Sequence, residues 1–191
     1  MAIDTLFDFR TEAFGNADPD AVSPTLRRYH QLLWSRPLPG GAIFDLSIST
    51  PGVYLHHRSA VGEFFLSSDT VIPTFTLWPV MKPITEQLTE LENTAFRTIQ
   101  YTIGGMMVWP GNRIQAKPTI NVARGFHPKI KDRMDLTLEC VRRHYLGQVS
   151  PLSDPLARYH DFFALFVDFT GYVKFFLLQD IRHAYRRPRR G

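Results

Sequence analysis

The feature that most constrains the fold is a stripe of apolar residues in the last third of the chain. Its members recur at steps of four, four, three and four residues: Ile130, Met134, Leu138, Val141 and Tyr145. This spacing places them on one face of an α-helix, and such a face must be buried against other elements. The sequence therefore predicts an amphipathic helix over 129–145, with Gly147 as its stop signal.

Further helices are predicted where a capping residue precedes a proline. Ser23-Pro24 indicates the start of a helix over 24–34, and Asp154-Pro155 indicates another after residue 153. Apolar residues favour a buried helix over 171–180, and Pro83 opens a predicted helix to about residue 92. Residues 11–22 are predicted to form a loop.

Strand patterns concentrate in the middle of the chain. Apolar and polar residues alternate over 44–48, and short strands are expected at 53–57 and 63–66. Residues 98–103 and 106–109 are predicted to form two strands around Gly104-Gly105, while 119–123 fits either a strand or a helical turn. With helices concentrated in the C-terminal third, this order predicts an α+β fold with a central, mostly antiparallel sheet.

Composition and charge favour one domain over residues 1–181 with a disordered, arginine-rich tail over 182–191. The 191 residues carry a net charge of +4, but five arginines lie in the tail. Without them, 17 basic residues stand against 18 acidic ones, so the body is nearly neutral. Contact of the tail with nucleic acid is not favoured, because terminal charge runs are usually solvated.

The sequence also limits the compartment. Cys140 is the single cysteine, which excludes an intrachain disulfide. No apolar stretch is long enough to span a membrane, and the start lacks the pattern of a signal peptide. We expect a soluble, cytoplasmic protein. Neither the oligomeric state nor a cofactor is predicted, and no metal site is expected because the histidines lack a ligand spacing.

An anion site is predicted at the segment 124–129. Gly125 allows backbone N–H groups to converge, and the start of the predicted helix would add partial positive charge. Arg124 and Lys129 would contact a small anion or nucleotide, where the 97–109 strands meet the helix. Arg58 or His57 would approach from a neighbouring strand. An ordinary helix-entry loop explains the same pattern.

Two other functions stay open. His57 and Glu63 could form an acid–base pair in an enzyme that acts on a nucleotide or nucleic acid, such as a transferase or nuclease in a toxin or defence role. The alternative is a strand with one packed and one solvated histidine. Exposed Trp78 and Trp109 in one apolar patch would instead favour a protein-interaction module. Whether the chain is an enzyme is therefore undecided.

Several segments resemble an uncharacterised bacterial protein family. They are Ser23-Pro24-Thr25-Leu26-Arg27-Arg28-Tyr29-His30, Gly104-Gly105-Met106-Met107, Asp135-Leu136-Thr137-Leu138-Glu139-Cys140 with Arg142-Arg143-His144-Tyr145, and Phe175-Phe176-Leu177-Leu178-Gln179-Asp180. The resemblance implies one intact domain and supplies no mechanism. Members of the family continue with ordered sequence where this chain becomes arginine-rich, which suggests a truncated or altered C-terminus.

A second resemblance is to ADP-ribosyltransferases, whose site begins with a strand-borne His or Arg and ends with a later Glu. Residues 53–58 and the Ser-Ser pattern at 64–68 are similar to the first part. The later Glu has no matching position on a strand here.

Overall fold

The computed structural model describes residues 3–44, 46, 54–59, 62–72, 79–111, 114–128 and 130–180. Three strands form one antiparallel sheet: β1 (His56–Ser59), β2 (Gly62–Thr70) and β3 (Met106–Pro110). The central strand, β2, pairs with β1 over its first half and with β3 over its second half. With helices gathered in the C-terminal part, the fold is α+β, as predicted.

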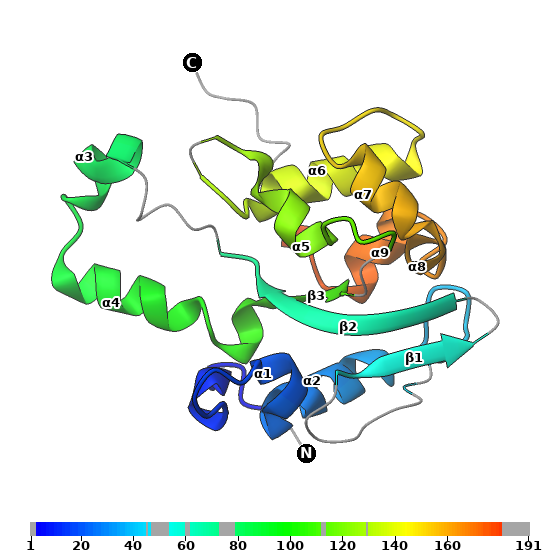
Figure 1. Ribbon diagram of the computed structural model, residues 1–191, viewed down its shortest axis with the longest axis horizontal. Coiled ribbons are helices and arrows are strands. Elements are labelled where there is room, and N and C mark those ends of the chain that lie inside the picture. Colours follow the sequence, from blue (N-terminus) through cyan, green and yellow to red (C-terminus); the bar gives the residue numbers. More distant parts are fainter. Residues whose placement is uncertain are drawn as a thin grey trace.

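The helices lie in two groups around this sheet (Figure 1). One group is N-terminal and comprises α1 (Pro19–Val22) and α2 (Pro24–Trp34). The other covers the opposite side and comprises α5 (Ile120–Ala123), α6 (Met134–Tyr145), α7 (Ser153–Arg158), α8 (His160–Ala164) and α9 (Phe169–Phe175). Two further helices, α3 (Lys82–Thr85) and α4 (Glu90–Ile99), extend away from the sheet.

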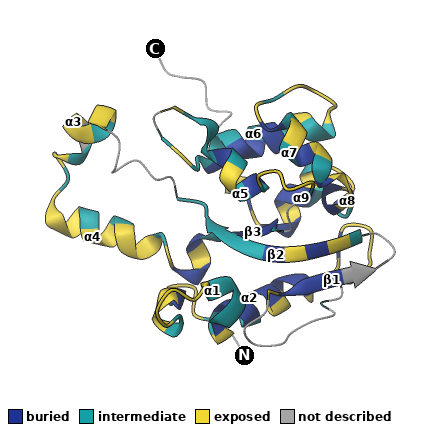
Figure 2. Cartoon of the chain, in the orientation of Figure 1, coloured by how far each residue is buried: buried dark blue, intermediate teal, exposed yellow. Residues whose placement is uncertain are grey.

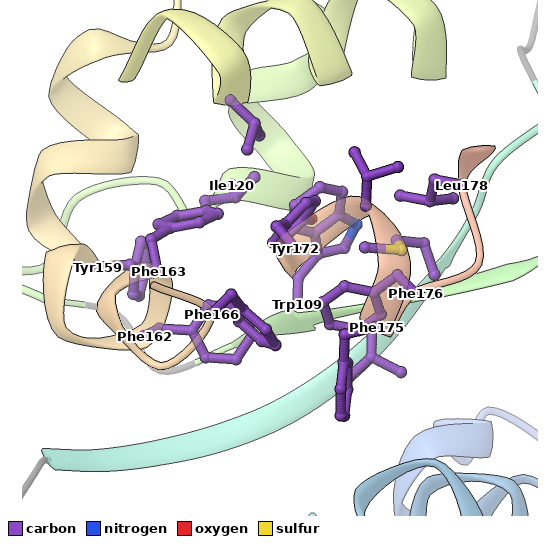
Figure 3. Close-up of a cluster of buried hydrophobic side chains, with 14 of the residues drawn as sticks. Trp109, Ile120, Tyr159, Phe162, Phe163, Phe166, Tyr172, Phe175, Phe176 and Leu178 are labelled. Carbon is purple, nitrogen blue, oxygen red and sulfur yellow. The ribbon is translucent and has the colours of Figure 1, made fainter. Parts of the chain in front are cut away.

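Aromatic side chains dominate the main core between the sheet and the C-terminal helices (Figure 3). Phe162, Phe166 and Tyr172 are fully buried and meet edge to face, with ring centroids 5.3 to 5.5 Å apart. The Trp34 ring, at the end of α2, reaches Phe162 at 6.1 Å. This contact fixes the N-terminal helices to the same core, so α1 is held in place beside the sheet.

The helix over 24–34 is confirmed, and its capping explains how α1 and α2 are joined. Ser23 ends α1 and caps α2, where its Oγ accepts a hydrogen bond from Leu26 N. The Ser23 hydroxyl donates to Glu12 Oε2 at 2.6 Å, and Thr25 donates to the same carboxylate through its N–H and its hydroxyl. One carboxylate therefore fastens the junction of the two helices.

The strand predicted over 98–103 is wrong. A capping box between Thr89 and Glu92 starts α4, which continues to Ile99. Two turns follow the end of α4: Tyr101 N donates to Thr98 O, and Thr102 N donates to Ile99 O. The predicted helix over 83–92 is in fact split between α3 and α4. The apolar face expected there is not buried, because α4 has no buried residue and is mostly exposed (Figure 2), and Leu91 is 80% exposed.

The long C-terminal helix is confirmed only from Met134 onward. Before it, Asp132 has a φ of 57°, which lies in the left-handed region and interrupts a helix. The helix ends at Tyr145, and Gly147, with a φ of 66°, supplies the predicted stop. Residues 120–123 form a helix, which settles the ambiguity there, and α1 replaces part of the loop predicted over 11–22.

Five other predictions are decided only in part. Most of the strand predicted over 44–48 lies outside the described residues, as does the tail over 182–191. The strand expected at 53–57 begins at His56, and the one expected at 63–66 extends to Thr70. Of the residues predicted to be buried near the C-terminus, Phe175, Phe176 and Leu178 are buried, whereas Leu177 is 67% exposed.

The hydrogen bonds that Glu12 accepts from Ser23 and Thr25 yield a prediction about stability. Burial alone would raise the pKa of Glu12, but the hydrogen bonds from Ser23 and Thr25 lower it overall. A lowered folded-state pKa stabilises the protein above the unfolded value of about 4.3, and this contribution is lost as pH falls through the folded value. We expect Glu12→Gln to cost about 1–2 kcal/mol in urea unfolding at pH 7 and progressively less below pH 4.3.

The matched control is Glu86→Gln, which alters an exposed ion pair with Lys82 and should leave the urea midpoint unchanged. Equal effects of the two substitutions, or a Glu12→Gln effect that is constant with pH, would contradict this role of Glu12.

Candidate functional site

The candidate site lies at the edge of β2, beyond the residues of β2 that pair with β1. Leu66 N still donates to Leu55 O, beside the start of β1. The next N–H on that edge of β2 belongs to Ser68, because alternate backbone groups of a strand point to the same neighbour. This N–H donates to Asp20 Oδ2 at 2.8 Å, so a carboxylate from α1 binds this edge of β2.

A pocket of about 350 Å³ opens beside this edge, and we call it the edge pocket. Its described lining residues are mostly polar and come from the region of α1, from β2 and from the start of α5: Asp18, Asp20, Tyr54, Phe65, Leu66, Ser67, Ser68, Gly111, Thr119 and Asn121. The two carboxylates and the two aromatic rings define its chemistry.

Asp18 forms part of the wall of the edge pocket. It is the N-cap of α1, and its Oδ1 accepts a hydrogen bond from Asp20 N. Its Oδ2 accepts a hydrogen bond from the Tyr54 hydroxyl at 2.6 Å. This hydrogen bond to a carboxylate raises the pKa of Tyr54 to about 12, so the phenol stays protonated at neutral pH.

Asp20 has one free oxygen. Its side chain is only 9% exposed, and Oδ1 accepts no hydrogen bond. Oδ1 lies 3.6 Å from His30 Nε2, which is too long for a hydrogen bond. Asn121 Oδ1 is also buried without a partner, although Asn121 Nδ2 donates to Ser67 Oγ at 3.2 Å. Two acceptors are therefore unsatisfied among the lining residues.

Ser68, His30 and Asp20 contain the residue types of a catalytic triad, but their geometry differs from one. In a triad the serine and the carboxylate contact different ring nitrogens of the histidine. Here His30 Nε2 is the nitrogen nearest both groups, 2.9 Å from Ser68 Oγ and 3.6 Å from Asp20 Oδ1, while Nδ1 has no partner. The cluster therefore supports binding better than nucleophilic catalysis.

Arg124, predicted to contact an anion, lies in a 3₁₀ segment (Arg124–Phe126) eight residues or more before α6. Its guanidinium is fully buried and donates to Asp69 Oδ2 at 2.7 Å, to Thr70 O at 2.9 Å and to Asp132 O at 2.8 Å. Burial raises the pKa of Asp69, although the Arg124 charge opposes this. The geometry gives Arg124 a structural role between β2 and the segment before α6.

His57 and Glu63 are not brought together. His57 pairs across the sheet with Phe64, whereas Glu63 pairs with Arg58, so the two side chains point to opposite faces. The His57 ring is buried and stacks on Phe44 with centroids 3.8 Å apart. Glu63 instead contacts His56, with 2.8 Å between Oε1 and Nε2. The two side chains of the predicted catalytic pair therefore lie on opposite faces of the sheet.

The remaining predicted residues are only partly placed. Arg58 belongs to β1, but its side chain lies outside the described part of the structure, as does Lys129. Trp78 is likewise outside, and Trp109 is fully buried rather than exposed. Cys140 is buried, and burial raises the pKa of its thiol.

The described residues hold no cluster of three or more His, Cys, Asp or Glu side chains that could bind a metal ion. Within the same ranges, no helix is long and apolar enough to cross a membrane.

The chain matches a family of unknown function, DUF6994, over residues 3–186, and it belongs to that family. No curated protein and no solved structure matches it. The family assignment confirms the resemblance to an uncharacterised family and leaves the activity to be argued from the site itself.

The role of Arg124 can be tested by substitution. We expect Arg124→Ala to destabilise the protein by roughly 3–5 kcal/mol, because it leaves Asp69 and two backbone carbonyls without their buried partner. Urea unfolding measures this loss. Arg142→Ala, which alters a partly exposed pair with Glu139, is the matched control and should cost about 1 kcal/mol or less. A loss of similar size in both variants would refute the structural role of Arg124.

Proposed function

We propose that the protein binds a small polar molecule, rich in hydrogen-bond donors, in the edge pocket. The observation that carries the proposal is the side chain of Asp20, a residue of the pocket lining that is nine-tenths buried and whose Oδ1 accepts no hydrogen bond. A buried acceptor without a partner costs about 1–3 kcal/mol. A ligand donor that the Asp20 carboxylate turns to meet would recover much of this cost.

The rest of the lining supports the same class of ligand. Asn121 adds a polar side chain to this wall, and the Ser67 and Ser68 hydroxyls can donate or accept. Hydroxyl and ammonium groups match this wall. Tyr54 and Phe65 provide apolar surface against which the carbon frame of such a molecule could pack.

The sequence-based hypothesis of an anion or nucleotide ligand has weaker support. The Arg124 guanidinium is already bonded to Asp69, and the edge pocket presents two carboxylates, which repel an anion. Of the residues predicted to bind an anion, Lys129 and Arg58 are left, and their side chains lie outside the described part of the structure. The enzyme alternative loses the predicted His57–Glu63 pair, and the interaction-module alternative loses Trp109. Cytoplasmic location and bacterial origin stay predictions.

A thermal-shift screen of polyols, amines, nucleosides and phosphates tests the proposal. A ligand that binds only the folded state raises the Tm, and compounds rich in hydroxyl or ammonium groups should do so. Asn121→Leu removes one acceptor and fills part of the edge pocket, so we expect it to abolish these shifts.

Asn93→Leu on α4 is the matched control, because Asn93 lies outside the pocket lining, and it should leave every shift intact. Stabilisation by phosphates alone, unaffected by Asn121→Leu, would contradict the proposal and support the anion hypothesis.

A further inference from the structure

A second hollow lies beside α8, and we call it the Val167 hollow. Its volume is about 560 Å³, which is in the range of pockets that hold small molecules. Most of its described lining is apolar and comes from the segment after α2 and from the end of α8 with the turn that follows: Leu38, Ala42, Ala164, Leu165 and Val167. It shares no described lining residue with the edge pocket, so the proposed function does not account for it.

Val167 has a backbone conformation that is costly for its residue type. Its φ of 68° lies in the left-handed region, and Asp168 N donates to Phe166 O, which closes a three-residue turn around it. Glycine or asparagine usually takes this conformation after a helix, whereas a β-branched residue there is a genuine outlier. Among the described residues, Val167 is the one β-branched residue with a positive φ.

The contacts around Val167 hold this turn in place. Phe166 is fully buried in the aromatic core (Figure 3), and Asp168 caps α9 by accepting a hydrogen bond from Gly171 N at 2.7 Å. A Cβ atom at Gly171 would clash with Phe166 O, so the turn packs directly on the start of α9. The fold therefore imposes the conformation, but it does not require valine, because glycine would adopt it without strain.

The strained residue also presents an apolar side chain to solvent. Val167 lines the hollow and is 68% exposed. Valine at this position thus makes the free protein less stable in two ways, through strain and through exposure. Strain of this kind clusters at ligand-binding positions, where the rest of the fold over-determines it. A ligand that covers Val167 would offset the exposure, so the combination points to binding.

One charged side chain limits the head group of such a ligand. Asp161, in the first turn of α8, is the one charged residue in the described lining, and no ion pair among the described residues includes it. A carboxylate beside an apolar wall favours a head that is an ammonium or hydroxyl group and disfavours a negative one.

We infer that the Val167 hollow binds small molecules that have an apolar body and a hydrogen-bond-donating head. The body covers Val167, and the Asp161 carboxylate accepts from the head. This inference goes beyond the proposed function, because it concerns a separate site and a more apolar class of ligand.

NMR titration of protein with isotope-labelled Val and Leu methyl groups tests the inference. The probes share one benzene ring and differ in the head: benzylamine, benzyl alcohol and benzoate. We expect benzylamine to shift the Val167 methyl signals and to bind more tightly than benzyl alcohol, while benzoate binds most weakly. Asp161→Asn should reduce the affinity for benzylamine to that for benzyl alcohol.

Val167→Gly distinguishes a ligand contact from a structural role. It relieves the strain, so the Tm should rise by roughly 2–4 °C. It also removes the apolar contact, so benzylamine should bind roughly fivefold more weakly. Leu177→Gly is the matched control, because Leu177 has a φ of 57° and is 67% exposed but lies outside the hollow, and it should leave the affinity unchanged.

If Val167→Gly fails to fold, Val167→Asn replaces it, since asparagine also tolerates a positive φ. Val167 methyl signals that do not move with benzylamine overturn the inference. So does a Val167→Gly variant that has a lower Tm than the wild type or binds benzylamine as tightly. An equal loss of affinity in Val167→Gly and Leu177→Gly overturns it as well.

The outcome also separates this inference from the proposed function. Benzylamine binding in the Val167 hollow should survive Asn121→Leu, because Asn121 lines the edge pocket alone. Benzylamine binding that Asn121→Leu abolishes, and that leaves the Val167 signals unmoved, belongs to the edge pocket. That result overturns this inference and leaves the proposed function intact.

Discussion

The arrangement of the site depends on one hydrogen bond at the edge of β2. β2 is longer than β1, and in the described part of the chain the Ser68 N–H donates to a side chain from α1 and not to a strand. A backbone donor that is partly buried must find another acceptor, and Asp20 supplies it. This single hydrogen bond explains why a short helix lies against the sheet edge and why a carboxylate is nearly buried there. The second oxygen of that carboxylate, Oδ1, is then buried without a hydrogen bond.

Other parts of the fold hold Asp20 at that position. Glu12 fastens the junction of α1 and α2, and Trp34 at the far end of α2 is anchored in the aromatic core. α1 has only four residues and would not form alone, because helices this short are unstable in water. The site is therefore a product of tertiary packing, which also explains why no local motif marks it. The membership in DUF6994 adds no activity to this reasoning.

The sequence predicted the elements whose signals are local. Ser23-Pro24 identified α2, and the stripe from Met134 to Tyr145 identified α6, because capping and periodicity depend on neighbouring residues. The strand prediction failed at residues 98–103. The period-two pattern there overlaps the end of the amphipathic helix α4, whose start is set by the capping box of Thr89 and Glu92. The start of α6 was placed too early because a residue with positive φ, Asp132, carries no strong sequence signal.

The candidate site was missed for a related reason. Asp18-Pro19 has the same N-cap and proline pattern that identified α2, and it could have predicted α1. Nothing in the sequence, however, pairs Asp20 with Ser68, 48 residues later, or with Asn121. Arg124 was predicted to contact an anion, but a buried arginine that binds a carboxylate of its own chain has the same sequence context as one that binds a ligand.

Amide hydrogen exchange of Ser68, followed by NMR, tests the central claim most directly. In the wild-type protein the account predicts protection at Ser68 comparable to that at Leu66, whose N–H donates to Leu55 O. In Asp20→Ala, Ser68 should exchange roughly tenfold to a hundredfold faster, while Leu66 stays protected. If Ser68 exchanges at the same rate in both proteins, Asp20 does not close the edge of β2, and the account of the site is wrong.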